Sequence, residues 1–213
     1  MGRRPALNLL DRLRRDRSRS VAAEERWLVV GLGNPEAQYG GTRHNLGADA
    51  VRRLAERLGA TFRPHGKVPA QVADSFDRPG GRPLSLVVPF GYMNDCGGPV
   101  QQALAFYKVG HERLIVCHDD LDLELAALRL KRGGGHGGHN GLRSIDSRTG
   151  SRDYVRVRLG IGRPPGRQDP ADYVLKRFSA KDREQVDVTV EQAGDAVLDV
   201  VSFGLEPAQN RHH

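Results

Sequence analysis

Short apolar runs separated by polar segments recur along the chain, and their spacing predicts alternating strands and helices. Residues 27–30 form a short run rich in β-branched side chains, as in a buried strand. A polar segment, residues 31–45, follows it. Helical spacing then places one apolar face on Leu46, Ala50, Val51, Leu54 and Leu58. A strand, a long loop and a helix in this order are typical of an α/β unit, which places ligands in that loop.

The same alternation continues to the end of the chain. Apolar runs predict further strands over residues 71–75, 84–88, 114–117, 125–130 and 154–161. Helical periodicity predicts helices over residues 99–109, 142–147, 169–178 and 182–203. The last helix carries a core stripe of Val186, Val190, Ala193, Val197 and Val200. The order of elements predicts a single-domain α/β fold, a mixed β-sheet flanked by helices.

The charge of the chain is concentrated in one region. The net charge of the 213 residues is +7. Residues 127–167 hold ten Lys and Arg against two acids, Asp146 and Asp153, so the remainder of the chain is close to neutral. The strand over residues 154–161 contributes Arg156 and Arg158 to one basic face. A basic zone of this density favours a polyanion partner, most simply nucleic-acid phosphate.

Residues 1–25 are Arg-rich and precede the first predicted strand without joining the α/β pattern. We therefore predict a basic, flexible extension over residues 1–25 and a catalytic domain over residues 26–213. An organelle-targeting peptide is the alternative, because Arg and Ser are enriched, but the extension also contains Asp11, Asp16, Glu24 and Glu25.

The cysteine content and the hydropathy restrict the compartment. The chain has two cysteines, Cys96 and Cys117, which fits a reduced cytoplasmic protein better than a disulfide scaffold. No apolar run approaches the ~20 residues that a membrane span needs. The expectation is a cytoplasmic protein that does not act as a membrane protein.

Three polar segments each follow an apolar strand: residues 31–45, 91–95 and 118–122. Because the carboxyl ends of strands in α/β sheets share an edge, these segments are expected to converge on one cleft. His44 is the leading candidate for a general base, since a neutral imidazole accepts a proton near pH 7. The carboxylates that could orient it are Asp119, Asp120 and Asp122.

The sequence favours water as the nucleophile, because it contains no G-x-S-x-G elbow. Three asparagines could donate hydrogen bonds to a carbonyl or a developing oxyanion without titrating: Asn34, Asn94 and Asn140. Structural roles compete with these. Asn34 before Pro35 is typical of a turn, Met93 of core packing, and the acids at 120 and 122 of a turn or a surface.

The glycine-rich stretch over residues 133–141, GGGHGGHNG, permits close approach of a phosphate or ribose, or serves only a tight turn. It lacks the Gly-Lys-Ser/Thr ending of a Walker loop. In the first polar segment Glu36 occupies the third glycine position of a dinucleotide fingerprint. His118, His136 and His139 raise the possibility of zinc, but neither C-x-x-C nor H-E-x-x-H spacing supports it.

Five motifs, taken in order, resemble those of bacterial-type peptidyl-tRNA hydrolase. They are GLGNP with Tyr39 and TRHN, MN at 93–94, HDDLD at 118–122, GGGHGGHNG, and RVRLGIGRP. The resemblance covers residues 27–211. It implies a three-layer α/β/α fold and hydrolysis of the ester between a peptide and the 3′ ribose of tRNA, which recycles tRNA from aborted translation.

The resemblance also implies a role for individual residues. It makes His44 the general base and Asp119 its orienting carboxylate. Peptide and ester binding falls to Asn34, Met93, Asn94 and Asn140, and His139 lines the cleft beside them. Tyr39 lies where the family contacts the 3′ end of tRNA, and Lys131 and Arg158 match a pair that clamps the 5′-phosphate. The implied enzyme is a cytoplasmic monomer that uses no metal or cofactor and binds the tRNA acceptor stem and 3′ end.

Two departures from the family pattern and two rival functions stay open on sequence alone. The family more often has Glu at position 120, and Asp95-Cys96 replaces a commoner apolar-Ser pair at the cleft rim. One rival is a non-catalytic RNA-binding relative. The other is a metal-dependent hydrolase built on His118, Asp120 and Asp122.

Overall fold

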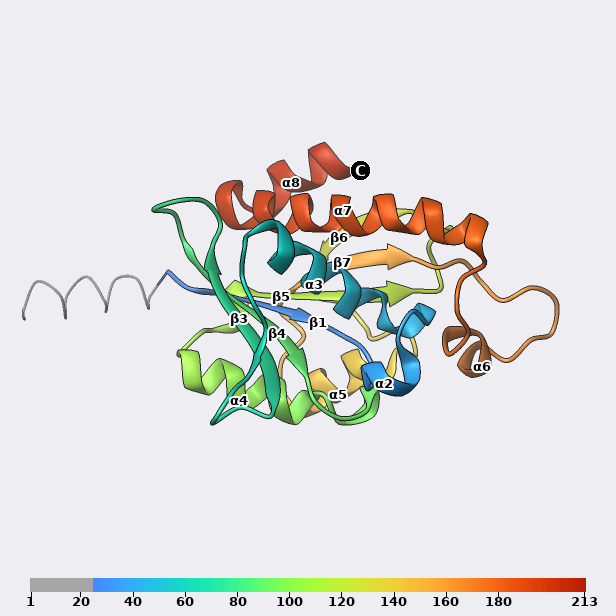
Figure 1. Cartoon of the computed structure of the whole chain (residues 1–213), viewed down its shortest axis with the longest axis horizontal. Helices are drawn as coiled ribbons and strands as arrows, with labels where there is room; N and C mark the ends of the chain where they lie inside the picture. The colour runs from blue at the N-terminus through green and yellow to red at the C-terminus, as the bar shows by residue number, and fades with distance from the viewer. Residues whose placement is uncertain (1–24) are drawn as a thin grey trace, which may run out of the picture.

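The computed structural model describes residues 25–213, which form a seven-stranded mixed sheet covered by helices on both faces (Figure 1). The strands are β1 (Trp27–Gly31), β2 (Arg63–Pro64), β3 (Ala70–Phe76), β4 (Pro83–Pro89), β5 (Leu114–Asp120), β6 (Leu128–Arg132) and β7 (Val155–Gly160). They are ordered β2-β3-β4-β1-β5-β7-β6. The central strands β4, β1, β5 and β7 run parallel, and the outer strands are antiparallel to their neighbours.

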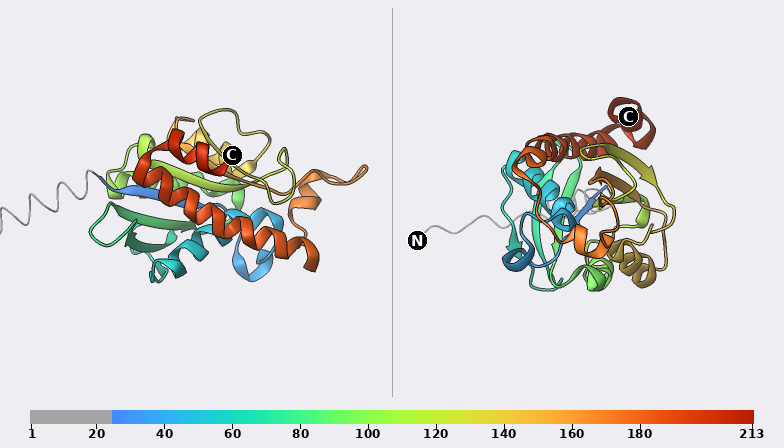
Figure 2. Two further views of the ribbon diagram at one scale, coloured as in Figure 1. Left: turned by 90° about the horizontal axis from the view of Figure 1, so that it is seen from above. Right: turned by 90° about the vertical axis from the view of Figure 1, so that its right-hand side faces the viewer.

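Two helical layers enclose the sheet (Figure 2). The helices are α2 (Glu36–Tyr39), α3 (Leu46–Arg57), α4 (Gly97–Tyr107), α5 (Asn140–Thr149), α6 (Pro170–Val174), α7 (Ala180–Phe203) and α8 (Leu205–His212). Helices α3, α7 and α8 share one core cluster with the sheet, and α4 and α5 share the other. The predicted α/β class and three-layer arrangement are confirmed.

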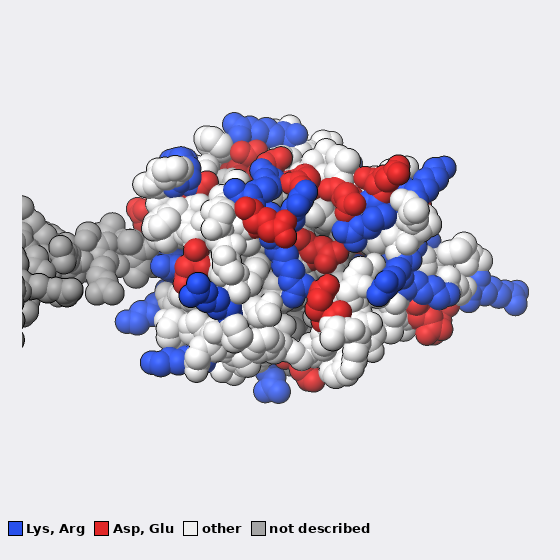
Figure 3. All heavy atoms as spheres, in the orientation of Figure 1, with Lys and Arg blue, Asp and Glu red and all other residues white. Residues whose placement is uncertain are grey.

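The core stripe predicted for the last long helix is buried in the α3–α7 layer. On the solvent side of this layer, ion pairs join the two helices, among them Arg183 to Asp49 at 3.2 Å. Figure 3 shows this surface, on which Lys and Arg side chains are interspersed with Asp and Glu. Such exposed pairs contribute little stability individually, so the buried stripe determines the packing.

The start of α3 lies directly against the end of β5. A Cβ at Gly47 would lie 2.1 Å from the carbonyl oxygen of Cys117, a distance that no side chain tolerates. Glycine therefore permits the close approach of helix and strand. Because His44 precedes α3 by two residues, this approach brings its turn to the carboxyl end of β5.

The prediction of an uninterrupted loop over residues 31–45 is wrong. The segment contains α2 and a 3-10 turn, η1 (Arg43–Asn45). The strand predicted over residues 114–117 continues through Asp120, because the main chain of residues 118–120 pairs with β7. A ladder depends on backbone groups, so the polar side chains that suggested a loop do not end it.

The predicted helix over residues 169–178 ends at Val174, because the carbonyls of Lys176 and Arg177 accept hydrogen bonds from Arg43. The strand predicted from residue 125 begins at Leu128, after a turn in which Ala126 has φ of 62°. The short β2 and the closing α8 were not predicted.

Helix α8 covers the outer edge of the sheet at β6. The side chain of Gln209 donates to the carbonyl of Leu130 at 3.0 Å, and Nε2 of His213 accepts from the N–H of Leu130 at 2.8 Å. Both main-chain groups of Leu130 on the outer side of β6 are therefore occupied by side chains.

The predicted flexible extension over residues 1–25 lies, except for Glu25, outside the described residues. Within residues 25–213, no helix combines the length and the apolar content needed to cross a bilayer.

Candidate active site

A cleft of about 610 Å³ opens at the carboxyl edge of the parallel strands. Its walls come from the end of β5, the glycine-rich segment before α5, the outer strands β6 and β7, and α6. Six of the predicted site residues line it: His44, Asp119, Lys131, His139, Asn140 and Arg158. Of the three polar segments predicted to converge, residues 31–45 and 118–122 contribute His44 and Asp119–Asp122 to the lining, whereas residues 91–95 do not line the cleft.

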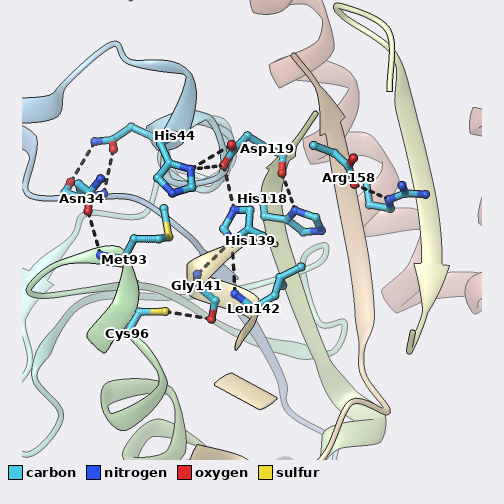
Figure 4. A network of polar contacts seen from close by, with 12 residues as sticks. Asn34, His44, Met93, Cys96, His118, Asp119, His139, Gly141, Leu142 and Arg158 are labelled. Carbon is cyan, nitrogen blue, oxygen red and sulfur yellow. Dashed lines mark hydrogen bonds and ion pairs between the residues drawn. The ribbon is translucent and has the colours of Figure 1, made fainter. Parts of the chain in front are cut away.

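The centre of the cleft is a buried carboxylate held between two imidazoles (Figure 4). His44 Nδ1 lies 3.0 Å from both carboxylate oxygens of Asp119, and His139 Nε2 lies 3.0 Å from one of them. Asp119 is 2% exposed and His44 is 7% exposed. We call these three residues the acid–base centre.

The hydrogen bonds fix the tautomer of both rings. His139 is the N-cap of α5, and its Nδ1 accepts from the N–H groups of Gly141 and Leu142. Its proton therefore lies on Nε2 and is donated to Asp119. His44 likewise donates from Nδ1, which leaves its Nε2 lone pair without a partner among the described residues. The centre thus presents one basic nitrogen at the cleft.

Burial and charge act in opposite directions on these groups. Burial of the His44 ring lowers its pKa, but the negative charge and hydrogen bond of Asp119 outweigh burial, so the pKa is raised above 6.5. Burial of Asp119 raises its pKa, but His44 and His139 together hold it well below the usual range. Asp119 is therefore ionised across the range in which His44 titrates.

His118, next to Asp119 in the chain, differs from His44 in its protonation. It is buried, and its Nδ1 donates to the main-chain oxygen of Asp119 at 2.7 Å. Burial, followed by the proximity of His139, lowers the pKa of His118 to about 3, so the ring is neutral.

The metal-dependent alternative built on His118, Asp120 and Asp122 is wrong on geometry. Among residues 25–213, the one group of three His, Cys or acidic side chains with ligating atoms close enough to share an ion is the acid–base centre itself. Asp120 instead pairs with Arg158 at 2.8 Å, and Asp122 pairs with Arg163. Within the centre, the hydrogen bonds to Asp119 already occupy one nitrogen of each imidazole.

A second group of predicted residues lies on the other side of His44, next to the cleft but not in its lining. The side-chain oxygen of Asn34 accepts from the main-chain N–H of Met93 at 2.8 Å, so its amide group remains as a donor. Met93 is 3% exposed and packs against Gly141, where a Cβ would lie 2.6 Å from its sulfur. Met93 therefore packs in the core, at the same position where peptide binding was also predicted.

Sequence reasoning assigned no role to Asn45, which is fully buried. Its side chain accepts from the N–H of Asn34 at 2.8 Å and donates to the carbonyl of Asn34 at 3.0 Å. It therefore fixes the backbone of Asn34 to the turn that carries His44. Its place next to His44 in TRHN was the available signal.

Asn94 and Tyr39 lie outside the cleft lining. Asn94 is exposed on the 3-10 turn that holds Met93. Tyr39, at the end of α2, packs edge-on against the ring of Tyr92 with centroids 6.3 Å apart. Asn140, in contrast, begins α5 at the cleft, directly after His139.

The comparisons with known proteins agree with this arrangement. The family model for peptidyl-tRNA hydrolase matches residues 28–213. The chain belongs to the peptidyl-tRNA hydrolase family. It is similar to the peptidyl-tRNA hydrolases of Frankia casuarinae, with 54% identity over 88% of this chain and 93% of the relative, and of Mycobacterium bovis, with 52% identity over 87% and 96%.

A solved structure shows the same fold. The crystal structure of peptidyl-tRNA hydrolase from Acinetobacter baumannii aligns with a TM-score of 0.81 and 34% identity, over 88% of this chain and 94% of that one. The family resemblance predicted from the five motifs is confirmed. This chain is an enzyme that hydrolyses peptidyl-tRNA and releases tRNA.

In this hydrolase, β6 and β7 place four basic residues on one face of the sheet edge. Arg129 lies opposite Arg158, and Lys131 lies opposite Arg156, so alternation directs all four to the same face. We call these four residues the basic ladder. It corresponds to the basic face predicted for residues 154–161.

The members of the basic ladder differ in how they are paired. Arg156 is 3% exposed and donates to the carbonyls of Gly134 and Gly135 at 2.8 and 2.7 Å, so it holds the glycine-rich segment in place. Arg158 pairs with Asp120. Lys131 is exposed and has no carboxylate within 4.0 Å in the described part of the chain. The local positive charge is thus smaller than the sequence count suggested, because acids from residues 118–122 neutralise part of it.

Proposed function

We propose that His44 is the general base that activates water for hydrolysis of the peptidyl-tRNA ester. The observation that carries this role is the Nδ1–H to Asp119 hydrogen bond, which leaves a basic Nε2 facing a substrate-sized cleft. A carboxylate on the far nitrogen selects the reactive tautomer and stabilises the imidazolium that forms.

In the proposed reaction, the oxygen of a water molecule attacks the ester carbonyl carbon while its proton moves to Nε2 of His44. The carbonyl oxygen becomes an oxyanion, for which the amide groups of Asn34 and Asn140 are the available donors. Collapse of the tetrahedral intermediate breaks the bond to the ribose 3′-oxygen, which takes the proton from His44. The products are a peptide acid and free tRNA, and the base is restored.

In this proposal, residues at the surface around the acid–base centre bind the RNA side of the substrate. Lys131 and Arg158 line the same cleft as His44, and their charges suit the 5′-phosphate and acceptor stem of tRNA. Half-buried Tyr39 and exposed Asn94, near the Asn34 side, would contact the 3′ end and the peptide. Met93, under the same surface, would form its floor.

We also propose that the enzyme acts as a monomer in the cytoplasm. Both cysteines are free and buried, and burial raises the pKa of each thiol to about 12, which suits a protein without disulfides. Sedimentation at micromolar concentration should give a mass near 23.4 kDa, and a mass twice as large would contradict the monomer.

Turnover of an N-blocked aminoacyl-tRNA by the wild type and by His44→Ala tests the role of His44. Removal of a general base costs roughly 10²–10⁴ in rate, so we expect kcat to fall in that range. Binding of free tRNA and the melting temperature should stay close to wild type. Near-equal kcat values would remove His44 from the role.

A further inference from the structure

The residue before His44, Arg43, is a buried charge with no part in the proposed reaction. It is 8% exposed and lies in the same 3-10 turn as His44, yet it does not line the cleft. A guanidinium is almost never buried to this extent unless partners replace its water. Its partners therefore indicate what the position is for.

The side chain of Arg43 is enclosed by the segment that follows α6. Its Nη1 donates to the carbonyl oxygens of Lys176 at 3.1 Å and Arg177 at 2.8 Å. Its guanidinium carbon lies 4.3 Å from the ring centre of Tyr173 and 4.8 Å from that of Phe178. Nη1 thus donates to two carbonyls while the planar guanidinium stacks on two rings, a combination that a lysine ammonium does not reproduce.

The main chain makes the same connection. The N–H of Arg43 donates to the carbonyl of Lys176 at 3.1 Å, and Thr42 forms an isolated antiparallel bridge with Arg177. A carboxylate of α7, Asp182, lies 4.0 Å from Arg43. The turn that carries His44 and the chain after α6 are thus one hydrogen-bonded unit.

This unit leads directly to the cleft. Helix α6 lies at the end of the molecule (Figure 1), and its stretch of chain forms one cleft wall through Asp169, Pro170, Ala171 and Val174. We propose that Arg43 is a positioning residue, which fixes this wall against the η1 turn and thereby holds His44 Nε2 in its reactive place. The inference rests on the role proposed for His44.

The test compares Arg43→Lys in two backgrounds, wild type and His44→Ala, using single-turnover hydrolysis of an N-blocked aminoacyl-tRNA. Lysine keeps the charge but cannot donate to both carbonyls and stack on both rings at the same time. Because small misplacements of a reacting group cost up to about 10²-fold, we expect a fall in rate of about tenfold or more in the wild-type background. In the His44→Ala background, the residual rate should change by less than about twofold, since the group being positioned is absent.

A matched control separates positioning from general destabilisation. Arg183→Lys weakens a different interaction between elements, the ion pair to Asp49 on α3, and neither residue lines the cleft. We expect it to lower the melting temperature while leaving the rate unchanged. If Arg43→Lys lowers the melting temperature alone, or lowers the rate equally in both backgrounds, the inference is wrong.

A second variant keeps the test decisive if Arg43→Lys fails to fold. Phe178→Leu removes one of the two rings against the guanidinium and leaves the hydrogen bonds from Arg43 to the two carbonyls. It should reduce the rate by about threefold in the wild type and not at all in His44→Ala; a loss of the same factor in both would overturn the inference. A fully active His44→Ala variant would instead remove the proposed general base, so the two failures are distinguishable.

Discussion

At the acid–base centre, the buried carboxylate of Asp119 is bonded by two imidazoles, whereas on the basic ladder of the same cleft Lys131 is exposed and unpaired among the described residues. The first arrangement fixes charge and proton positions before substrate arrives, which suits electrostatic preorganisation. The second leaves charge available to a polyanion. We therefore expect changes at the centre to alter the chemical step, and changes on the ladder to alter binding and its dependence on salt.

The largest effect should come from Asp119→Asn. An amide can donate to Nδ1 of His44, which moves the ring proton to Nε2 and removes the basic lone pair. We expect kcat to fall about 10³-fold. In the wild type, the rate falls as pH drops through the raised pKa of His44; without the carboxylate, burial lowers that pKa, so the residual activity should show an acid limb at lower pH.

A pH–rate profile of both forms from about pH 5 to about pH 9 measures this shift. His44→Gln provides the control. Because this variant has no imidazole at position 44, its profile should show no loss of rate at low pH from protonation there. An acid limb that stays in place, or moves to higher pH, would mean that Asp119 does not set the protonation of His44.

A smaller effect should separate the two hydrogen-bonding jobs of His139. In His139→Asn, the side-chain oxygen can still cap α5 but no donor reaches Asp119; in His139→Gln, the longer amide can reach Asp119 but the cap is lost. We expect kcat to fall about tenfold in the Asn variant and less than about threefold in the Gln variant. The Gln variant should be less stable by about 1 kcal/mol, the usual cost of removing an N-cap.

Steady-state kinetics and chemical denaturation of the two variants are sufficient to check this. Faster turnover by the Asn variant than by the Gln variant would show that the cap, and not the bond to Asp119, is what turnover requires.

The smallest effect on the chemical step is expected on the ladder. Lys131→Ala and Arg158→Ala should weaken substrate binding several-fold and leave the single-turnover rate at saturation unchanged. Each variant should also reduce the salt slope by about 0.7–0.9 for every phosphate that it no longer neutralises. The larger binding loss should follow Lys131→Ala, because Asp120 already pairs with Arg158.

Binding assays between about 50 and about 200 mM salt measure the slope, with Arg53→Ala on the opposite layer as a charge-matched control. An unchanged slope in both ladder variants would assign the ladder a purely structural role. A fall in the single-turnover rate at saturation would mean that the basic ladder also contributes to the chemical step.

The sequence was informative where a local pattern determines structure, and less so where contacts between distant residues do. The α/β class, the core stripe of α7 and the position of His44 in the segment between the first strand and the first long helix follow from the periodicity of apolar residues. The cap made by His139 was not visible, since it depends on α5 beginning at Asn140 and not at Leu142 as predicted.

Arg156 and Arg158 illustrate the same limit. They lie two positions apart in one strand and the sequence does not distinguish them. Strand register places one under the carbonyls of the glycine-rich segment and the other beside Asp120. The end of α6 is likewise set by Arg43, more than a hundred residues earlier, so helical periodicity alone extended the helix too far.

The side chains of Gln209 and His213 at the edge of β6 bear on how copies of this protein meet one another. An open edge strand is a template for adding a strand from another molecule, which is a common start of aggregation. Here the main-chain groups of Leu130 are occupied by α8. At the other edge, β2 is two residues long and ends in Pro64, which has no N–H to offer. The outward main-chain groups of Leu130 are thus closed to strand addition, and β2 offers only a short template that lacks one N–H.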